Sequence, residues 1–161
     1  MAINRGKQFE DKFREDVKKS IRDASIDRLP DQMSGWKGST NICDFVVYKK
    51  PYIAYIECKV VEKGNTFNLK RLSQLNKLAE KRGIPGVILG VVIWFVEKEK
   101  VVFVPYFTFE KLIHDDKKSF HINMIGSTEY NNLDVRSVKR RIFLDSDYSE
   151  IFKEEWAYWV L

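Results

Sequence analysis

Residues 44–59, DFVVYKKPYIAYIECK, form the stretch that decides the fold of this chain. Apolar and β-branched residues on both sides of a Lys-Lys-Pro segment are typical of two strands joined by a tight turn. We therefore predict strands at 45–48 and 52–61 and a turn at 49–51. The second strand is almost wholly apolar up to its last acid, which is typical of a strand buried on both faces.

Three charged side chains gather at one end of this predicted hairpin. Glu57 and Lys59 are two residues apart, so they point to the same face of their strand. With the turn at 49–51, Asp44 lies roughly opposite Glu57, and directly opposed Cβ atoms in an antiparallel pair are about 5 Å apart. Two carboxylates held so close repel each other unless a cation lies between them, and hard oxygen ligands suit Mg²⁺ or Mn²⁺. The spacing indicates a metal-dependent phosphodiesterase.

A surface hairpin is the alternative interpretation of the same residues. Acidic and basic side chains are common on solvated strands, so Glu57 and Lys59 could simply face water. Against this, charged residues at the end of an apolar strand carry a desolvation cost that a surface pair does not. Spacing alone leaves both interpretations open.

Composition is typical of one globular domain. The chain has 161 residues, 44% of them hydrophobic, so it can bury a sizeable core. Its longest apolar run, at 86–96, is too short to span a bilayer and has a strand-like Val/Ile pattern. The N-terminus lacks an apolar signal region, so we expect a cytoplasmic protein without a membrane segment. We expect Cys43 and Cys58 to be buried free thiols, because two cysteines make neither a disulfide scaffold nor a zinc site.

Positive charge is in excess and clustered. The net charge is +5 and the calculated pI is near 9.1. Such a surface fits a polyanionic partner, whose binding weakens steeply with salt, although many other proteins share this charge. The clusters are Lys18-Lys19, Lys49-Lys50, Lys70-Arg71, Lys81-Arg82 and Lys139-Arg140-Arg141.

The remaining pattern predicts an α/β fold with a central mixed sheet flanked by helices. Apolar residues recur every fourth position from Phe9 to Ile21, which predicts a helix over 5–23. Glu10 lies at the margin of its buried face, where it either reaches the acids of the hairpin or is only solvated. Further predicted elements are a loop at 29–38, a helix at 69–82, strands at 87–95 and 101–105, a short helix at 109–113, and a C-terminal segment at 151–161 that packs on the core or on a partner chain.

The ordered set of polar residues resembles a known nuclease family. The order Glu10, Asp44, Glu57-x-Lys59 and Gln74 is similar to the signature of the restriction-endonuclease-like superfamily, an acid followed by Glu-x-Lys. More narrowly, the chain resembles RecU-type Holliday junction resolvases of bacteria and their phages over most of residues 4–120. It departs from them at 29–38, which is short where RecU proteins carry a long stalk, a feature that archaeal resolvases of the superfamily also lack. Further matching pieces are Asn4-Arg5-Gly6, Ser39-Thr40, Phe67-x-Leu69, Val102-Phe103-Val104-Pro105 and Lys118-Ser119-Phe120.

The resemblance implies a single nuclease domain over 1–161, of restriction-endonuclease-like fold, that hydrolyses DNA phosphodiesters. It implies that Asp44, Glu57 and the backbone carbonyl of Cys58 hold Mg²⁺ or Mn²⁺, and that Glu10 binds a second metal. Lys59 would act on the scissile phosphate and the water, and Gln74 would help to position the nucleophile. The implied DNA contacts are Arg5, Lys37, Ser39, Thr40, Lys70 and Arg71.

The implied partners are branched DNA and a second copy of the chain, in a bacterium or a phage-infected cell. A four-way junction has two scissile phosphates related by a two-fold axis, which a homodimer matches. The aromatic C-terminal segment and the apolar edge of the hairpin are the expected dimer surfaces. The alternatives are a nuclease for duplex or flap DNA and a non-catalytic DNA-binding protein on a nuclease fold. Against the last, every expected catalytic position is filled.

Overall fold

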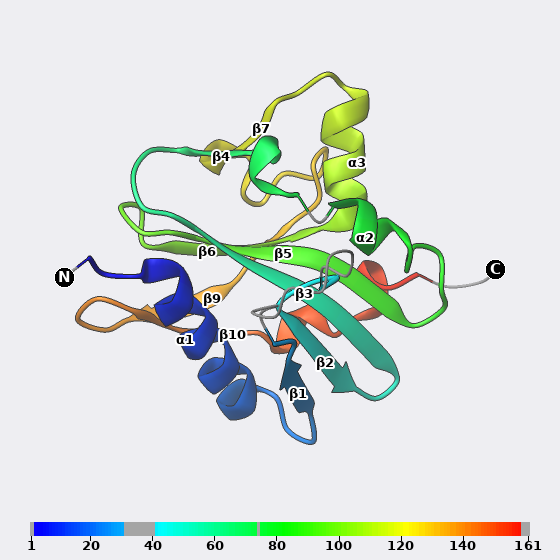
Figure 1. Ribbon diagram of the computed structural model, residues 1–161, viewed down its shortest axis with the longest axis horizontal. Helices are drawn as coiled ribbons and strands as arrows, with labels where there is room; N and C mark the ends of the chain where they lie inside the picture. The colour runs from blue at the N-terminus through cyan, green and yellow to red at the C-terminus, as the bar shows by residue number, and fades with distance from the viewer. Residues whose placement is uncertain (1, 31–40, 74, 159–161) are drawn as a thin grey trace, which may run out of the picture.

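A mixed β-sheet between two helical layers forms the centre of the computed structural model, which describes residues 2–30, 41–73 and 75–158 (Figure 1). Six strands run in the order β1-β2-β3-β5-β6-β8. β3 and β5 are parallel, and all other neighbouring pairs of this sheet are antiparallel. The predicted α/β fold with a central mixed sheet is therefore confirmed. The strands are β1 (Ser25–Arg28), β2 (Phe45–Lys49), β3 (Tyr52–Val61), β5 (Val87–Phe95), β6 (Lys100–Pro105) and β8 (Leu133–Asp134).

Helices cover both faces of this sheet. In Figure 1, α1 (Arg5–Ser20) lies on one side, and α2 (Leu75–Ala79) and α3 (Tyr106–His114) lie on the other. Within the ranges that the structure describes, no helix has the length and apolar character needed to cross a membrane. Two small sheets complete the fold: β4 (Thr66–Asn68) with β7 (Ser119–His121), and β9 (Arg136–Lys139) with β10 (Leu144–Asp147). The 3-10 turns are η1 (Leu69–Arg71), η2 (Ile122–Met124), η3 (Ser149–Ile151) and η4 (Glu154–Trp156).

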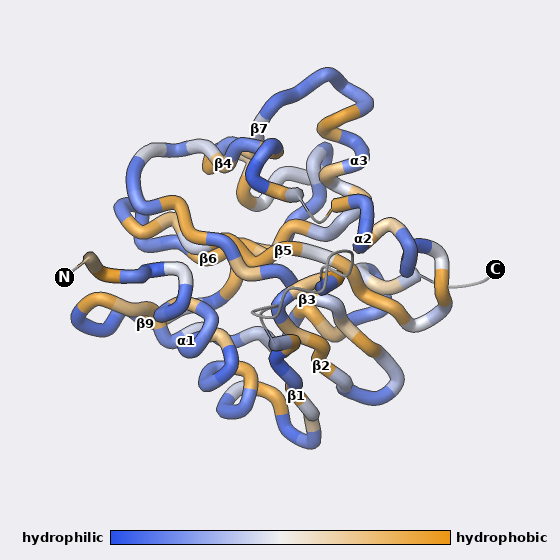
Figure 2. Tube along the Cα trace, viewed as in Figure 1, coloured by the Kyte–Doolittle hydropathy of each residue, from blue (hydrophilic) through white to orange (hydrophobic). Residues whose placement is uncertain are grey.

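The β2–β3 hairpin has the predicted strands and turn. Phe45 pairs with Ile56, so the register continued by one residue sets Asp44 opposite Glu57. β3 then pairs along its length with β5, in which all nine residues are buried. Gly90 of β5 allows the sheet to pack closely, because a Cβ at this position would lie 2.4 Å from the ring of Phe103. The hairpin thus lies inside the sheet, and hydrophobic segments gather at these central strands in Figure 2.

The apolar stripe of α1 packs on one face of the sheet, as predicted. Phe9, Phe13 and Val17 are buried against the β2–β3 hairpin and the C-terminal segments. Asn4 caps the helix by accepting a hydrogen bond from the backbone N–H of Lys7, which satisfies one otherwise unpaired donor. This packing fixes the direction of the first turns of α1 relative to β3.

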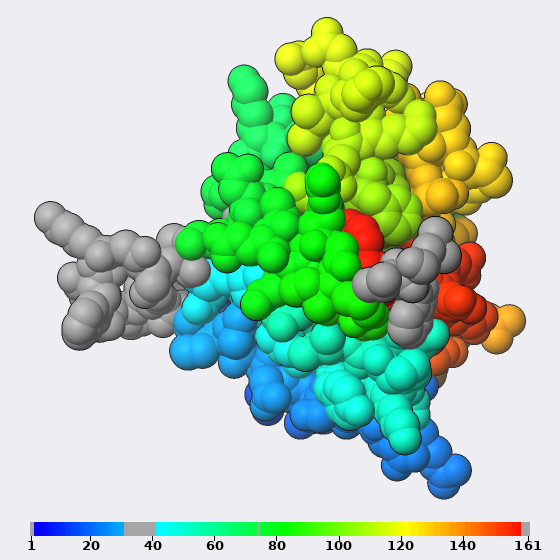
Figure 3. Space-filling view, turned by 90° about the vertical axis from the view of Figure 1, so that its right-hand side faces the viewer, coloured from blue at the N-terminus to red at the C-terminus, as the bar shows by residue number. Residues whose placement is uncertain are grey.

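Two sequence predictions need correction, and one pair of alternatives is decided. The helix predicted over 69–82 is instead the 3-10 turn η1 followed by the short helix α2, because Leu72 leaves the helical conformation (ψ 74°) and is buried. The C-terminal segment takes the first of its two predicted positions, on the core of its own chain, where Trp156 is 7% exposed. Figure 3 shows the last described residues (red) seated beside the segments coloured green and yellow-green. The hairpin has no free edge either, since β1 and β5 pair with its two sides.

Candidate functional site

Asp44 lies immediately before β2, with its carboxylate directed at β3. Its Oδ2 atom accepts a hydrogen bond of 2.8 Å from the backbone N–H of Cys58. Its own carbonyl accepts a hydrogen bond of 2.8 Å from Leu29, the residue that follows β1. The backbone and the side chain of Asp44 are therefore both fixed by neighbouring strands.

Glu57 is a buried acid in β3 that follows the apolar residues 52–56. Its side chain is 5% exposed, and its Oε1 atom lies 3.3 Å from the ammonium of Lys59. Burial raises the pKa of Glu57 to about 7, the negative charge of Asp44 adds to the rise, and Lys59 opposes it. The surface-hairpin interpretation is therefore wrong for Glu57, because this carboxyl is removed from water. A positive charge beside Asp44 and Glu57 would offset the repulsion between them and favour the ionised form of Glu57.

Glu10 reaches the edge of the same site from the first turns of α1. Its negative charge also contributes to the raised pKa of Glu57 and to that of the Cys58 thiol. Its Oε2 atom lies 2.6 Å from a guanidinium nitrogen of Arg28, and the two side chains are 18% and 29% exposed. Sequence reasoning did not single out Arg28 or the strand β1 that carries it.

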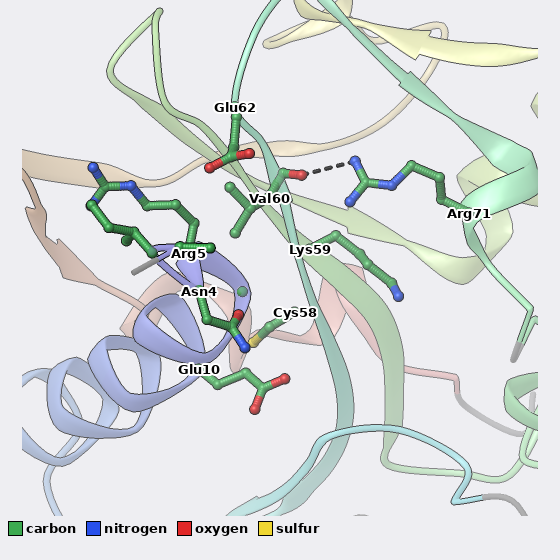
Figure 4. Close-up of a pocket in the computed structure, with 11 residues that line it drawn as sticks. Asn4, Arg5, Glu10, Cys58, Lys59, Val60, Glu62 and Arg71 are labelled. Atoms are coloured by element: carbon green, nitrogen blue, oxygen red, sulfur yellow. Dashed lines mark hydrogen bonds between the residues drawn. The ribbon is translucent and has the colours of Figure 1, made fainter.

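A groove of about 680 Å³ runs between the start of α1 and β3 (Figure 4). Glu10, Cys58 and Lys59 line it, together with cationic side chains at its two flanks. Arg5 lies on the α1 side in Figure 4 and Arg71 on the opposite side of β3. Arg71 donates a hydrogen bond of 2.8 Å to the carbonyl of Val60, so its guanidinium is held at the groove. The other lining residues are Ala2, Ile3, Asn4, Gly6, Val60 and Glu62.

The other predicted site residues lie elsewhere or outside the described part. Lys70 lines a second hollow with Ile113, Lys117 and Lys118, separate from the groove. Cys43 and Cys58 are buried free thiols, as predicted, and burial raises the pKa of Cys43 to about 12. Lys37, Ser39, Thr40 and Gln74 lie outside the described residues.

The two hairpin acids have the chemistry of a divalent-cation site. Among the described residues, no three His, Cys, Asp or Glu side chains are grouped tightly enough to hold a metal ion. Asp44 and Glu57 nevertheless fit a cation as a pair, since each is held by β3 and the pKa of Glu57 is raised partly by its neighbour's charge. A cation bound between two carboxylates removes that repulsion.

Comparison with known proteins establishes the fold alone. No family model matches the chain, and no curated protein matches its sequence. A similar solved structure is that of Hjc from Archaeoglobus fulgidus, a Holliday junction resolvase from an archaeal hyperthermophile. The two share 18% sequence identity with a TM-score of 0.53, over 80% of this chain and 95% of that chain. This chain has the same fold. The restriction-endonuclease-like architecture expected from the sequence is therefore confirmed.

Residues that sequence reasoning missed form a second charged cluster on the far part of α1. Lys12 lies 2.6 Å from both Asp16 and Asp145, and the Ser146 N–H donates a 3.0 Å hydrogen bond to Asp16. The i, i+4 spacing of Lys12 and Asp16 was a visible signal for a helix pair. Nothing local indicated Asp145, since it is 133 residues from Lys12.

Proposed function

We propose that this protein is a metal-dependent DNA endonuclease that resolves four-way junctions by paired phosphodiester hydrolysis. One observation carries the proposal: the buried acid Glu57, with a pKa raised to about 7, lies between Asp44 and Lys59 at the end of the hairpin. This arrangement has little structural use, because Glu57 is buried beside the negative charge of Asp44 and Lys59 offsets only part of that cost. The shared fold with a Holliday junction resolvase adds support.

The hairpin acids are the proposed metal ligands. Asp44 and Glu57 would hold Mg²⁺ or Mn²⁺, and the backbone carbonyl of Cys58 would complete the protein ligands. The hydrogen bond from the Cys58 N–H keeps the Asp44 carboxylate facing β3 and ready to coordinate. A divalent ion held there would supply an activated water and would neutralise charge on the scissile phosphate.

Lys59 is the proposed phosphate-facing cation. Its ammonium lies on the same side of β3 as Glu57, at 3.3 Å from that carboxylate, and lines the groove. From there it would orient the attacking water or the phosphate, and it would stabilise the negative charge that grows in the transition state. An ammonium already anchored by an acid loses little freedom on binding DNA.

The groove beside α1 is the proposed path of one DNA strand. Arg5 and Arg71 flank it, and Glu10, Cys58 and Lys59 lie along it. Lys70 would contact DNA from the neighbouring hollow. Further proposed DNA contacts are Lys37, Ser39 and Thr40. Gln74 would help to position the nucleophile. Binding through phosphates should weaken as salt is raised.

The junction assignment includes the oligomeric state and the family. Residues 1–161 would act as one nuclease domain in a cytoplasmic RecU-type resolvase of a bacterium or phage, and a two-fold homodimer would present two such sites to the symmetric phosphates of a junction. A nuclease for duplex or flap DNA would use the same residues. Only substrate comparison separates these functions.

A gel cleavage assay tests the proposal. It compares a synthetic four-way junction with a linear duplex of the same arm sequence, at low salt with Mg²⁺, and uses Asp44→Asn as the control. Paired symmetric nicks in the junction, absent from the duplex and from the variant, are expected. Equal cutting of both DNAs would replace junction resolution by general nuclease activity. Tight junction binding without cutting would replace catalysis by a structural DNA-binding role.

A further inference from the structure

The backbone of Arg28 lies beside the start of β2, and its side chain reaches the helix acid Glu10. Arg28 ends β1, where it pairs in register with Phe45, the residue after Asp44. The next residue, Leu29, donates its N–H to the Asp44 carbonyl at 2.8 Å. From this position the Arg28 guanidinium reaches Glu10 at 2.6 Å. One short strand therefore links the carboxylate from α1 to the acid at the start of β2.

Positive charge is already present around the three carboxylates Glu10, Asp44 and Glu57. Arg28 pairs with Glu10 and Lys59 with Glu57, and Arg5 and Arg71 add two guanidinium groups at the flanks of the groove. One divalent ion at Asp44 and Glu57 removes the repulsion between those two acids. A second divalent ion at Glu10 would lie beside the Arg28 guanidinium, where like charges repel strongly.

We propose that Arg28 takes the position of a second metal ion, so that the site binds one divalent cation, at Asp44 and Glu57. This inference rests on the proposed function and assigns Glu10 to Arg28 instead of to a metal. A metal at Glu10 would have to share its carboxylate with the Arg28 guanidinium, which is 2.6 Å from Oε2, and the two positive charges would repel each other. Displacing the guanidinium instead would leave it partly buried without that carboxylate. Arg28 is therefore a positioning residue: it orients Glu10 at the groove and sets the charge there.

A purely structural role is the competing explanation of the same ion pair. The bond between Arg28 and Glu10 also ties β1 to α1, and its loss could change stability alone. The two explanations differ in one measurable quantity, the number of metal ions bound per chain. A structural link has no effect on that number in a folded protein, whereas a cation that excludes a metal does.

Counting bound Mn²⁺ tests the inference. Free Mn²⁺ is measured by electron paramagnetic resonance during titration of the full chain at high protein concentration, without DNA. The wild type should bind one ion per chain. Arg28→Met and Arg28→Gln should each bind two, and adding Glu10→Gln to either should return the count to one. Arg28→Lys keeps the cation and should bind one. Lys18→Met, an equal loss of charge at an exposed position of α1, is the matched control and should also bind one.

The outcomes that overturn the inference are distinct from those that overturn the proposed function. Two ions in the wild type, or one ion in a folded neutral Arg28 variant, would show that Arg28 does not exclude a metal; either result leaves metal-dependent cleavage at Asp44 and Glu57 intact. Circular dichroism identifies which of the two neutral variants is folded. The count of Mn²⁺ ions in the wild type tests the inference without either variant. A wild type that binds no Mn²⁺ and cuts no junction would overturn both.

Discussion

Two charged clusters on the α1 side of the molecule use the same residue types to opposite effect. In the first, Asp16 is buried, yet it receives Lys12 at 2.6 Å and the Ser146 N–H at 3.0 Å, and Asp145 completes the network. In the second, the ammonium of Lys59 is 3.3 Å from Glu57 and the charge of Asp44 opposes ionisation. The first cluster joins the β9–β10 hairpin to α1. The second contains an acid whose ionisation costs free energy because it is buried beside another carboxylate.

The difference between the two clusters indicates which of them is suited to bind a cation from solution. Burial raises the pKa of both Asp16 and Glu57, but in the first case protein donors oppose the rise at short distance. At Glu57 the charge of Asp44 is the largest cause after burial, whereas at Asp16 the opposing hydrogen bonds come before the charge of Asp145, so a cation from solution would gain most at Glu57. If this contrast is correct, changes in the two clusters will have opposite effects on stability.

A large effect on catalysis is expected at Lys59. Lys59→Met should lower the rate of junction cleavage by about 100- to 1,000-fold, because it removes a cation directed at the scissile phosphate. The rate is measured under single-turnover conditions with saturating Mg²⁺. Lys63→Met, at an exposed position after β3, is the matched control and should cut at the wild-type rate. Equal rates for the two variants would remove Lys59 from the proposed site.

The largest expected loss of stability is at the compensated cluster. Asp16→Ala should destabilise the fold by roughly 3–5 kcal/mol, because it leaves a partly buried ammonium and the Ser146 N–H without this carboxylate. Urea denaturation gives the free energy of unfolding. Asp11→Ala, at an exposed position of α1, should change it little. A small effect of Asp16→Ala would mean that this cluster does not hold the hairpin to α1.

The opposite sign is expected at the site in metal-free protein. The pKa of Glu57 rises from 4.5 to about 7 on folding. The folded state therefore binds more protons than the unfolded state between these values, and wild-type stability falls as pH rises through this window. Glu57→Gln has no such dependence, so it should be more stable by about 2–3 kcal/mol at pH 8 and nearly equal at pH 4. A difference that does not vary with pH would contradict the raised pKa.

Divalent metal should change the free energy of unfolding by a smaller amount, and only through the hairpin acids. Mg²⁺ at about ten times its dissociation constant should stabilise the wild type by about 1.4 kcal/mol, since it binds only the folded state. Asp44→Asn and Glu57→Gln should gain little, and Asp16→Asn should gain as much as the wild type. Thermal unfolding with and without the ion measures these gains. Equal stabilisation of all four proteins would place the ion away from the hairpin acids.

Sequence reasoning predicted what strong local patterns encode. Alternation and length were enough for the hairpin and for β5, and the register of Asp44 against Glu57 followed from the turn position. It failed where different local structures bury the same residues. Leu72, Leu75 and Leu78 have helical spacing, yet a 3-10 turn and a short helix also bury Leu72 and Leu78.

Contacts between segments far apart in the chain could not be predicted from the sequence. β1 has four residues, too few for an alternation signal, so Arg28 and its bond to Glu10, 18 residues away, were missed. The sequence left open whether the aromatic C-terminal segment packs on the core or on a partner chain, and Trp156 packs on Phe103 and Phe107 of the same chain. Such contacts depend on the tertiary fold, which no local window contains.

The most direct test of the account measures binding and cleavage on the same four-way junction with the wild type and Asp44→Asn. The account predicts that Asp44→Asn binds the junction with an affinity within about threefold of the wild type, since the basic surface is unchanged. Its cleavage in Mg²⁺ should fall by at least about 1,000-fold. Near-normal cleavage by Asp44→Asn would contradict the assignment of the hairpin acids as the metal site.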